Sequence, residues 1–439
     1  MRFRILIVAL AAVLLTVVGA VFGLRQGPSP NAEATQAAGT LAHSTTAPAD
    51  QLAESIARAQ SHLREVPGDY VAWAALGSEY IEQARVTADP TYYPKAEGAL
   101  RRSLKLRRSG NPAALVGLGA LANARHEFAA ARTLARRVLR TDSYSADAYG
   151  VLADAQTQLG NATAATDAVQ HMLDLRPGLA SYSRASYDLE QQGRLSDAIA
   201  LMRRALRDAV DPADIAFCRY QLGELAWRTG RIDGAAAEYS AGRAADPAYL
   251  PFLAGEGRVA AARGQTDVAL ADYAHLTARY PSPMYLMEYA NLLRAVGQPM
   301  RAEQQLALAD AALRLFTANG GTDDLGAAQL ALAEGHPKRA VEAGRREWSR
   351  RHFADVADIL GWALHRTGAN TEAISYARTA NRLGARNPGY LFHLGMIELS
   401  LGRRGAARHD LRIALALNPH FAPLDAPVAR AALKRLDAR

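Results

Sequence analysis

Hydrophobic and polar positions divide the chain into three regions. Residues 5–24, ILIVALAAVLLTVVGAVFGL, contain no charged side chain, and a helix of this length spans about 30 Å, the hydrocarbon thickness of a bilayer. Residues 25–50 are rich in Pro, Ala, Ser and Thr without a stripe of large apolar residues, which predicts a disordered linker. From residue 51 onward, apolar and polar positions recur in units of about 34 residues, which predicts helical repeats.

The first region is predicted to direct the chain to a membrane. Arg2 and Arg4 precede the apolar run, and this charge bias keeps the N-terminus cytoplasmic and places the rest of the protein on the other side. The run is longer than the roughly 7–15 apolar residues of a cleaved signal peptide, and Arg25 closes it. Residues 1–24 are therefore predicted to be a retained transmembrane anchor, with a cleaved signal peptide and a secreted protein as the alternative.

The third region carries a regular pattern of small residues. Glycines recur at intervals of 33 to 38 residues, at Gly160, Gly193, Gly230, Gly264, Gly297, Gly335, Gly368 and Gly402. Five residues after each glycine stands an alanine: Ala165, Ala198, Ala235, Ala269, Ala302, Ala340, Ala373 and Ala407. A glycine ends a helix in the left-handed conformation, and an alanine lets the next helix pack closely against it. Each unit is therefore predicted to be a hairpin of two helices, stacked on its neighbours.

One unit shows a family signature. Trp73, Leu76, Gly77 and Tyr80 form the pattern W-x2-L-G-x2-Y, which resembles the first-helix signature of the tetratricopeptide repeat (TPR). The resemblance covers residues 54–421 and implies an all-α fold, an α-solenoid of about ten TPR helix-turn-helix repeats that form a right-handed superhelix. The closing stretch of the array also resembles the ends of bacterial envelope TPR proteins that lack a defined activity.

A turn sequence interrupts the array. The run TANGGTDD lies between Phe316 and Leu325, and we expect it to divide the array into residues 51–318 and 322–421. Residues 422–439 are predicted to form a polar capping helix, because the end of a solenoid must be compatible with water.

Composition excludes several functions. The single cysteine, Cys218, cannot form an internal disulfide, a four-cysteine zinc site or an iron–sulfur cluster. The net charge of +8 comes mostly from arginine, and basic clusters such as Arg101, Arg102 and Lys105 are interpreted as the solvated outer face of second helices. We expect no nucleic-acid partner, because export separates the protein from nucleic acid. No motif predicts a catalytic, cofactor or metal site.

The resemblance also implies a binding surface. In TPR arrays the first helices line a concave groove, and aromatic side chains and arginines gather at the corresponding positions from Tyr187 onward, the composition of binding hot spots. The candidate groove residues are Tyr187, Glu190, Tyr220, Glu224, Trp227, Arg228, Arg258, Asn291, Arg294, Asp358, Trp362, His365 and Arg366. The competing interpretation is that part of this set packs between neighbouring units.

These observations lead to one main hypothesis and two alternatives. The main hypothesis is a non-catalytic scaffold or assembly factor of the bacterial cell envelope, which binds a peptide or helix of another envelope protein in its groove. The body would face outward from the inner membrane, toward the periplasm. The alternatives are an enzyme with its active site in the groove, and a structural spacer without a specific ligand.

Overall fold

The computed structural model describes residues 48–438, a stretch that contains twenty-two helices and no strand. The predicted anchor, residues 1–24, and almost all of the predicted linker lie outside the described residues. The helices are α2 (Pro48–Glu65), α3 (Tyr70–Thr87), α4 (Tyr92–Leu106), α5 (Pro112–Ala124), α6 (Phe128–Leu139), α7 (Ala146–Gln158), α8 (Ala162–Leu175), α9 (Leu179–Gln191), α10 (Leu195–Asp208), α11 (Pro212–Arg228), α12 (Ile232–Ala245), α13 (Pro251–Ala262), α14 (Thr266–Arg279), α15 (Pro283–Ala295), α16 (Pro299–Ala318), α17 (Asp324–Ala333), α18 (Pro337–Arg350), α19 (Ala354–Arg366), α20 (Asn370–Ala380), α21 (Pro388–Ser400), α22 (Arg404–Leu417) and α23 (Asp425–Asp437).

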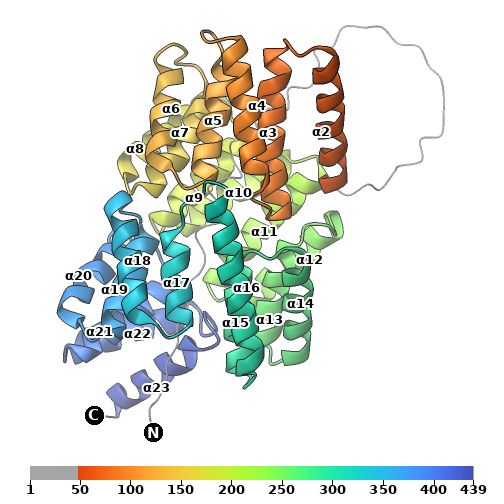
Figure 1. Ribbon diagram of the computed structural model, residues 1–439. Coiled ribbons are helices and arrows are strands. Elements are labelled where there is room, and N and C mark those ends of the chain that lie inside the picture. The colour runs from red at the N-terminus through yellow and green to blue at the C-terminus, as the bar shows by residue number, and fades with distance from the viewer. Residues whose placement is uncertain (1–47, 439) are drawn as a thin grey trace.

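Helices α3 to α22 form ten consecutive hairpins, which confirms the predicted all-α solenoid of about ten repeats (Figure 1). Each odd-numbered helix from α3 to α21 packs against its own even-numbered partner, and most of them also pack against the next odd-numbered helix. The odd-numbered helices therefore form the inner layer of the superhelix and the even-numbered helices the outer layer. No helix among residues 48–438 is both long and apolar enough to cross a membrane.

The small residues of the repeat are the contact points between helices. All eight alanines of the predicted series are buried, with at most 1% of each side chain exposed. In the inner helix α11, a Cβ added to Gly223 would lie 2.2 Å from the ring of Tyr239 in α12. Glycine is thus required there by close packing, as the repeat pattern predicts.

The turn between the two helices of a unit uses a left-handed residue throughout. The eight glycines of the series have φ values between +69° and +89°. In the first two units the same turn is made by Ala88 (φ +52°) and His126 (φ +62°), which the glycine series alone does not reveal. Residues with a Cβ adopt this conformation at a cost of roughly 1 kcal/mol.

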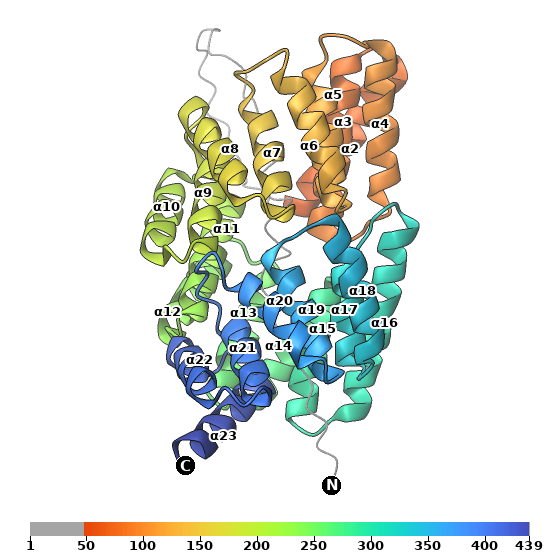
Figure 2. The ribbon, with the colours of Figure 1, turned by 90° about the vertical axis from the view of Figure 1, so that its left-hand side faces the viewer.

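The superhelix completes a full turn and continues beneath itself (Figure 2). The carbonyl of Arg125, in the second unit, accepts a hydrogen bond at 3.0 Å from the backbone N–H of Thr322, which precedes the eighth unit. The carbonyl of Leu159 accepts one at 3.4 Å from His352, which precedes the ninth unit. In both cases the lower edge of a unit in the first turn contacts the loop that begins the unit six places further on.

The predicted boundary near residue 320 falls on one of these contacts. Helix α16 ends at Ala318, α17 begins at Asp324, and Thr322 lies between them. The separation of the array into two domains stays a prediction. At the C-terminus, α23 packs against α22 in the place predicted for a capping helix.

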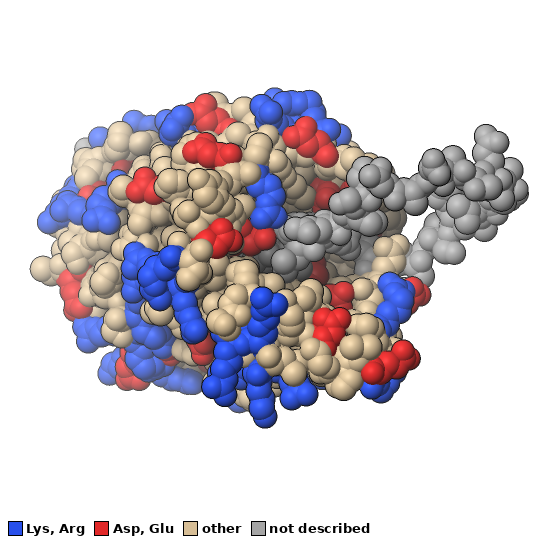
Figure 3. Space-filling view, turned by 90° about the horizontal axis from the view of Figure 1, so that it is seen from above, with Lys and Arg blue, Asp and Glu red and all other residues tan. Residues whose placement is uncertain are grey.

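The outer surface is charged with both signs. Figure 3 shows Lys and Arg side chains over much of the upper face, with Asp and Glu among them. Arg101, Lys105 and Arg108 are exposed at the end of the outer helix α4. This placement agrees with their interpretation as a solvated outer face.

Candidate functional site

The predicted groove residues lie on inner helices, but many are covered. Trp362 has 1% of its surface exposed, Tyr220 5% and Trp227 8%. The phenol oxygen of Tyr220 is 3.5 Å from that of Tyr285, 65 residues away. These aromatic side chains pack between helices, as in the competing interpretation, and their contribution to partner binding stays a prediction.

The charged residues of the set pair with one another from unit to unit. Glu190 of α9 forms an ion pair with Arg228 of α11, and Glu224 of α11 forms one with Arg258 of α13. Glu224 also accepts a hydrogen bond from the phenol of Tyr239 at 2.7 Å. Buried charges are costly unless they are paired in this way, so the pairs connect successive inner helices electrostatically.

The candidates in the second turn form a separate cluster. Asp358 accepts a hydrogen bond at 2.9 Å from Nδ1 of His393, and the His393 ring stacks on Trp362 with centroids 4.2 Å apart. His365 contacts Asn370 at 2.6 Å through Nδ1. Burial lowers the pKa of both His365 and Arg366. Arg294 donates to the carbonyl of Ala333 at 2.5 Å. Tyr187 packs in the same apolar cluster as Trp362, and its hydroxyl is buried without a partner among the described residues.

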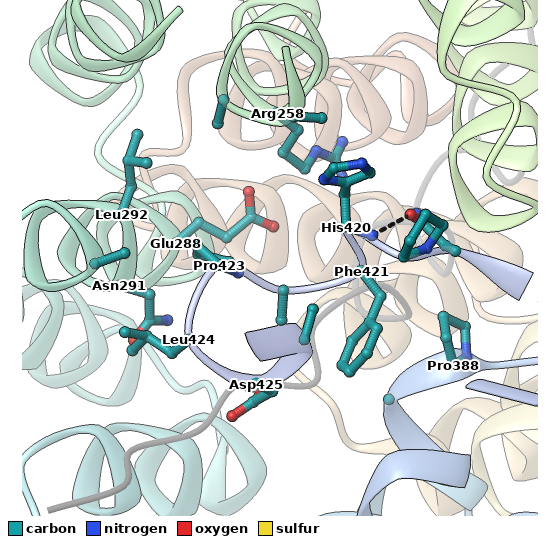
Figure 4. Close-up of a pocket in the computed structure, with 18 of the residues that line it drawn as sticks. Arg258, Glu288, Asn291, Leu292, Pro388, His420, Phe421, Pro423, Leu424 and Asp425 are labelled. Carbon is teal, nitrogen blue, oxygen red and sulfur yellow. Dashed lines mark hydrogen bonds between the residues drawn. The ribbon is translucent and has the colours of Figure 1, made fainter. Parts of the chain in front are cut away.

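An open space remains inside the superhelix, where the second turn covers the first (Figure 4). This cavity of about 320 Å³ is bounded by inner helices α11, α13 and α15, and on the other side by the segment that joins α22 to α23. We call residues 418–424 the strap. The side chain of Asn418 donates to the carbonyl of Trp227 at 2.7 Å, which ties the strap to the first turn.

Five of the thirteen predicted residues come together in this cavity: Glu224, Trp227, Arg228, Arg258 and Asn291. The prediction missed Tyr273, Glu288, His420, Phe421 and Asp425, which also line it. The repeat pattern carries no signal for the strap residues, because they reach the cavity only through contact between turns.

Electrostatics differ between the two glutamates of the cavity. Glu224 is neutralised by Arg258. Glu288 accepts a hydrogen bond at 2.8 Å from the phenol of Tyr273, and no ion pair joins it to any residue of the described chain. Burial raises the pKa of Glu288, while the nearby Arg258 opposes that rise. Within residues 48–438 no group of three His, Cys, Asp or Glu side chains is placed to hold a metal ion.

The architecture is that of a solenoid built from helical hairpins. Comparison with known proteins identifies the family of the repeat. Residues 184–249 match the family model of the tetratricopeptide repeat. Together with the ten hairpins, this match confirms the TPR assignment made from the sequence. No curated protein matches the chain significantly.

Solved structures with similar folds include other repeat proteins. A tetratricopeptide repeat protein from Parabacteroides merdae ATCC 43184 is 18% identical, with 59% of this chain and 98% of that chain covered and a TM-score of 0.36. The APC/C hetero-tetramer Cut9-Hcn1 is 13% identical, with 88% and 94% covered and a TM-score of 0.39. Yeast Tom70 is 13% identical, with 81% and 86% covered and a TM-score of 0.40. The TPR fold is typical of protein–protein interaction scaffolds.

Proposed function

We propose that this protein is a non-catalytic scaffold that binds an extended segment of a partner protein in the cavity between α11, α13, α15 and the strap. The observation that carries the proposal is the cavity itself, an opening of about 320 Å³ in the inner layer, lined by five residues of the predicted groove. A preformed cavity needs little reorganisation on binding, which favours recognition of a flexible segment.

The partner is proposed to belong to the bacterial cell envelope. Support comes from the sequence alone: the uncharged run at residues 5–24, with Arg2 and Arg4 before it, favours a body on the outer side of the inner membrane. Proteolysis of spheroplasts that express the full chain tests this placement, because an outward-facing body is digested without lysis. A body protected until lysis would contradict it.

Site-specific photo-crosslinking in intact cells of the source organism tests the binding site. The photoreactive phenylalanine would replace His420, which is exposed at the cavity, or Tyr144, which is 80% exposed and does not line it. We expect a discrete adduct with one partner from position 420 and none from position 144. The same products from both positions, or no adduct from position 420, would contradict a specific cavity partner.

Substitution of the buried aromatic side chains is a poorer test. Tyr220 and Trp227 pack inside the inner layer, so their replacement by alanine is expected to destabilise the fold by about 3 kcal/mol or more each. Loss of partner binding in such variants would therefore not separate a binding role from a packing role.

A further inference from the structure

Two of the three arginines that line the cavity are already paired with carboxylates. Arg228 is paired with Glu190, and Arg258 is paired with Glu224 and lies over the ring of Trp227 at 5.7 Å. An anionic ligand would have to displace one of these carboxylates and leave it buried without its partner, which costs several kcal/mol. The part of the cavity around Arg228 and Arg258 is therefore poorly suited to anions, whereas the exposed Arg430 donates only to the carbonyl of Pro419.

Two hydrogen-bond acceptors on α15 remain available. Glu288 has no ion-pair partner among the described residues, and only one of its carboxylate oxygens, Oε2, is bonded, to Tyr273. Asn291 is 97% buried, and its Oδ1 has no hydrogen-bond partner in the described chain. Because Glu288 and Asn291 are three residues apart, they lie on the same face of the helix, and both line the cavity. A buried acceptor left unpaired costs roughly 1–3 kcal/mol, which a donor on a ligand would recover.

The walls of the cavity suit an alkyl chain. Trp227, Leu292, Phe421 and Pro423 supply apolar surface around the two acceptors. Figure 4 shows the Glu288 carboxylate in the space between Arg258 and Pro423. A volume of about 320 Å³ is at the small end of ligand-binding cavities, so it accommodates one long side chain better than several residues.

We propose that the cavity binds a primary ammonium group on an alkyl stem, the chemistry of a lysine side chain, with the ammonium donating to Glu288 and Asn291. This inference rests on the proposed function, and it specifies that the partner segment presents a lysine. Ammonium fits better than guanidinium because Tyr273 already occupies one oxygen of Glu288 and so blocks the bidentate pairing that arginine prefers.

The test uses three six-carbon probes that differ in their head group: hexylammonium, hexan-1-ol and hexanoate. Binding to the full chain at pH 7 would be followed through the indole N–H signal of Trp227, assigned among the four tryptophans with the W227F variant. We expect a saturable shift of this signal with hexylammonium and at least tenfold weaker binding of hexan-1-ol and hexanoate. Equal binding of hexylammonium and hexan-1-ol, or tighter binding of hexanoate, would overturn the proposal.

A matched pair of variants identifies the acceptor. Glu288→Gln should weaken hexylammonium binding at least tenfold, whereas Glu303→Gln, the same change on the exposed face of α16, should not. Unchanged affinity in Glu288→Gln would also overturn the proposal, and if that variant fails to fold, the comparison of the three probes on the native chain still decides. If position 420 crosslinks to a partner but the cavity shows no preference for hexylammonium, the scaffold function would be supported and only the proposal of a lysine ligand would be refuted.

Discussion

Two kinds of contact hold this molecule together, and they differ in chemistry. Neighbouring helices within a turn meet through small residues packed against large ones, as Gly223 of α11 packs against Tyr239 of α12. Successive turns of the superhelix meet through backbone and polar groups, as in the hydrogen bond from Thr322 to Arg125 and that from Asn418 to Trp227. The first kind recurs in every unit, whereas the second joins residues almost two hundred positions apart. Contacts within a turn therefore build the solenoid, and contacts between turns create its cavity.

The comparison predicts opposite outcomes for two glycines that lie inside helices. Gly223→Ala places a methyl group 2.2 Å from the buried Tyr239 ring, and we expect it to lower the free energy of unfolding by about 3 kcal/mol. Gly98→Ala adds a methyl group that meets nothing within 4 Å, so its higher helix propensity should raise stability by up to about 1 kcal/mol. Urea denaturation of both variants measures the difference. Equal effects would show that the packing of α11 against α12 does not depend on Gly223.

A second pair of glycines isolates the contact between turns. Gly193 and Gly264 have nearly the same left-handed φ, +73° and +75°. A Cβ at position 193 would lie 2.2 Å from the carbonyl oxygen of Gly384 in the second turn, whereas at position 264 it meets nothing within 4 Å. Both Gly→Ala variants should lose about 1 kcal/mol from backbone strain, and Gly193→Ala about 1–2 kcal/mol more from the clash.

The two variants should also differ in shape. If the turns are pushed apart, small-angle X-ray scattering will give a larger radius of gyration for Gly193→Ala than for Gly264→Ala. An identical radius and an identical loss of stability in both variants would mean that the turn-to-turn contact adds nothing to the fold.

The same distinction explains what could be predicted from the sequence. The glycine and alanine series predicted eight of the ten hairpins, because each unit must bury its own hydrophobic faces against its neighbours. The glycine series did not predict the turns at Ala88 and His126, because tertiary packing there holds a residue with a Cβ in the left-handed conformation. Nothing periodic marks Asn418 or Thr322 as contacts of the first turn, so closure of the superhelix could not be predicted.

The candidate site shows the same limit. Glu224, Arg258 and Asn291 line the cavity, and the repeat position alone places them on the inner helices; their role in binding stays a prediction. Trp362 occupies an equivalent inner position, yet His393 and Phe392 cover it. Whether an inner residue is open or covered depends on the large side chains of the next unit as well as on which part of the next turn lies over it, and the sequence pattern does not contain that information.

The last prediction concerns pH and a carboxyl group between the turns. Asp355 of α19 is buried and accepts a hydrogen bond from the phenol of Tyr390. Burial and the neighbouring Asp358 raise the pKa of Asp355 to about 7, while Arg351 and, from the first turn, Arg228 oppose the rise and Glu190 adds to it. Because the folded protein holds this proton more tightly than the unfolded chain, its stabilising effect is complete below about pH 4 and is lost as the pH rises toward 7.

Asp355→Asn removes this titration and keeps an acceptor for Tyr390. The native protein should therefore lose stability between pH 4.5 and 6.5 more steeply than Asp355→Asn, by at most about 1.4 kcal/mol per pH unit. Asp154, whose pKa burial raises to about 6, contributes equally to both proteins and cancels in the difference. Asp267→Asn, the same change of charge at an exposed position, serves as the control and should keep the native slope. Parallel pH profiles for the native protein and Asp355→Asn would show that the Asp355 carboxyl group is ionised in the folded state at acidic pH. The packing of the second turn against the first would then not exclude water from this carboxyl group.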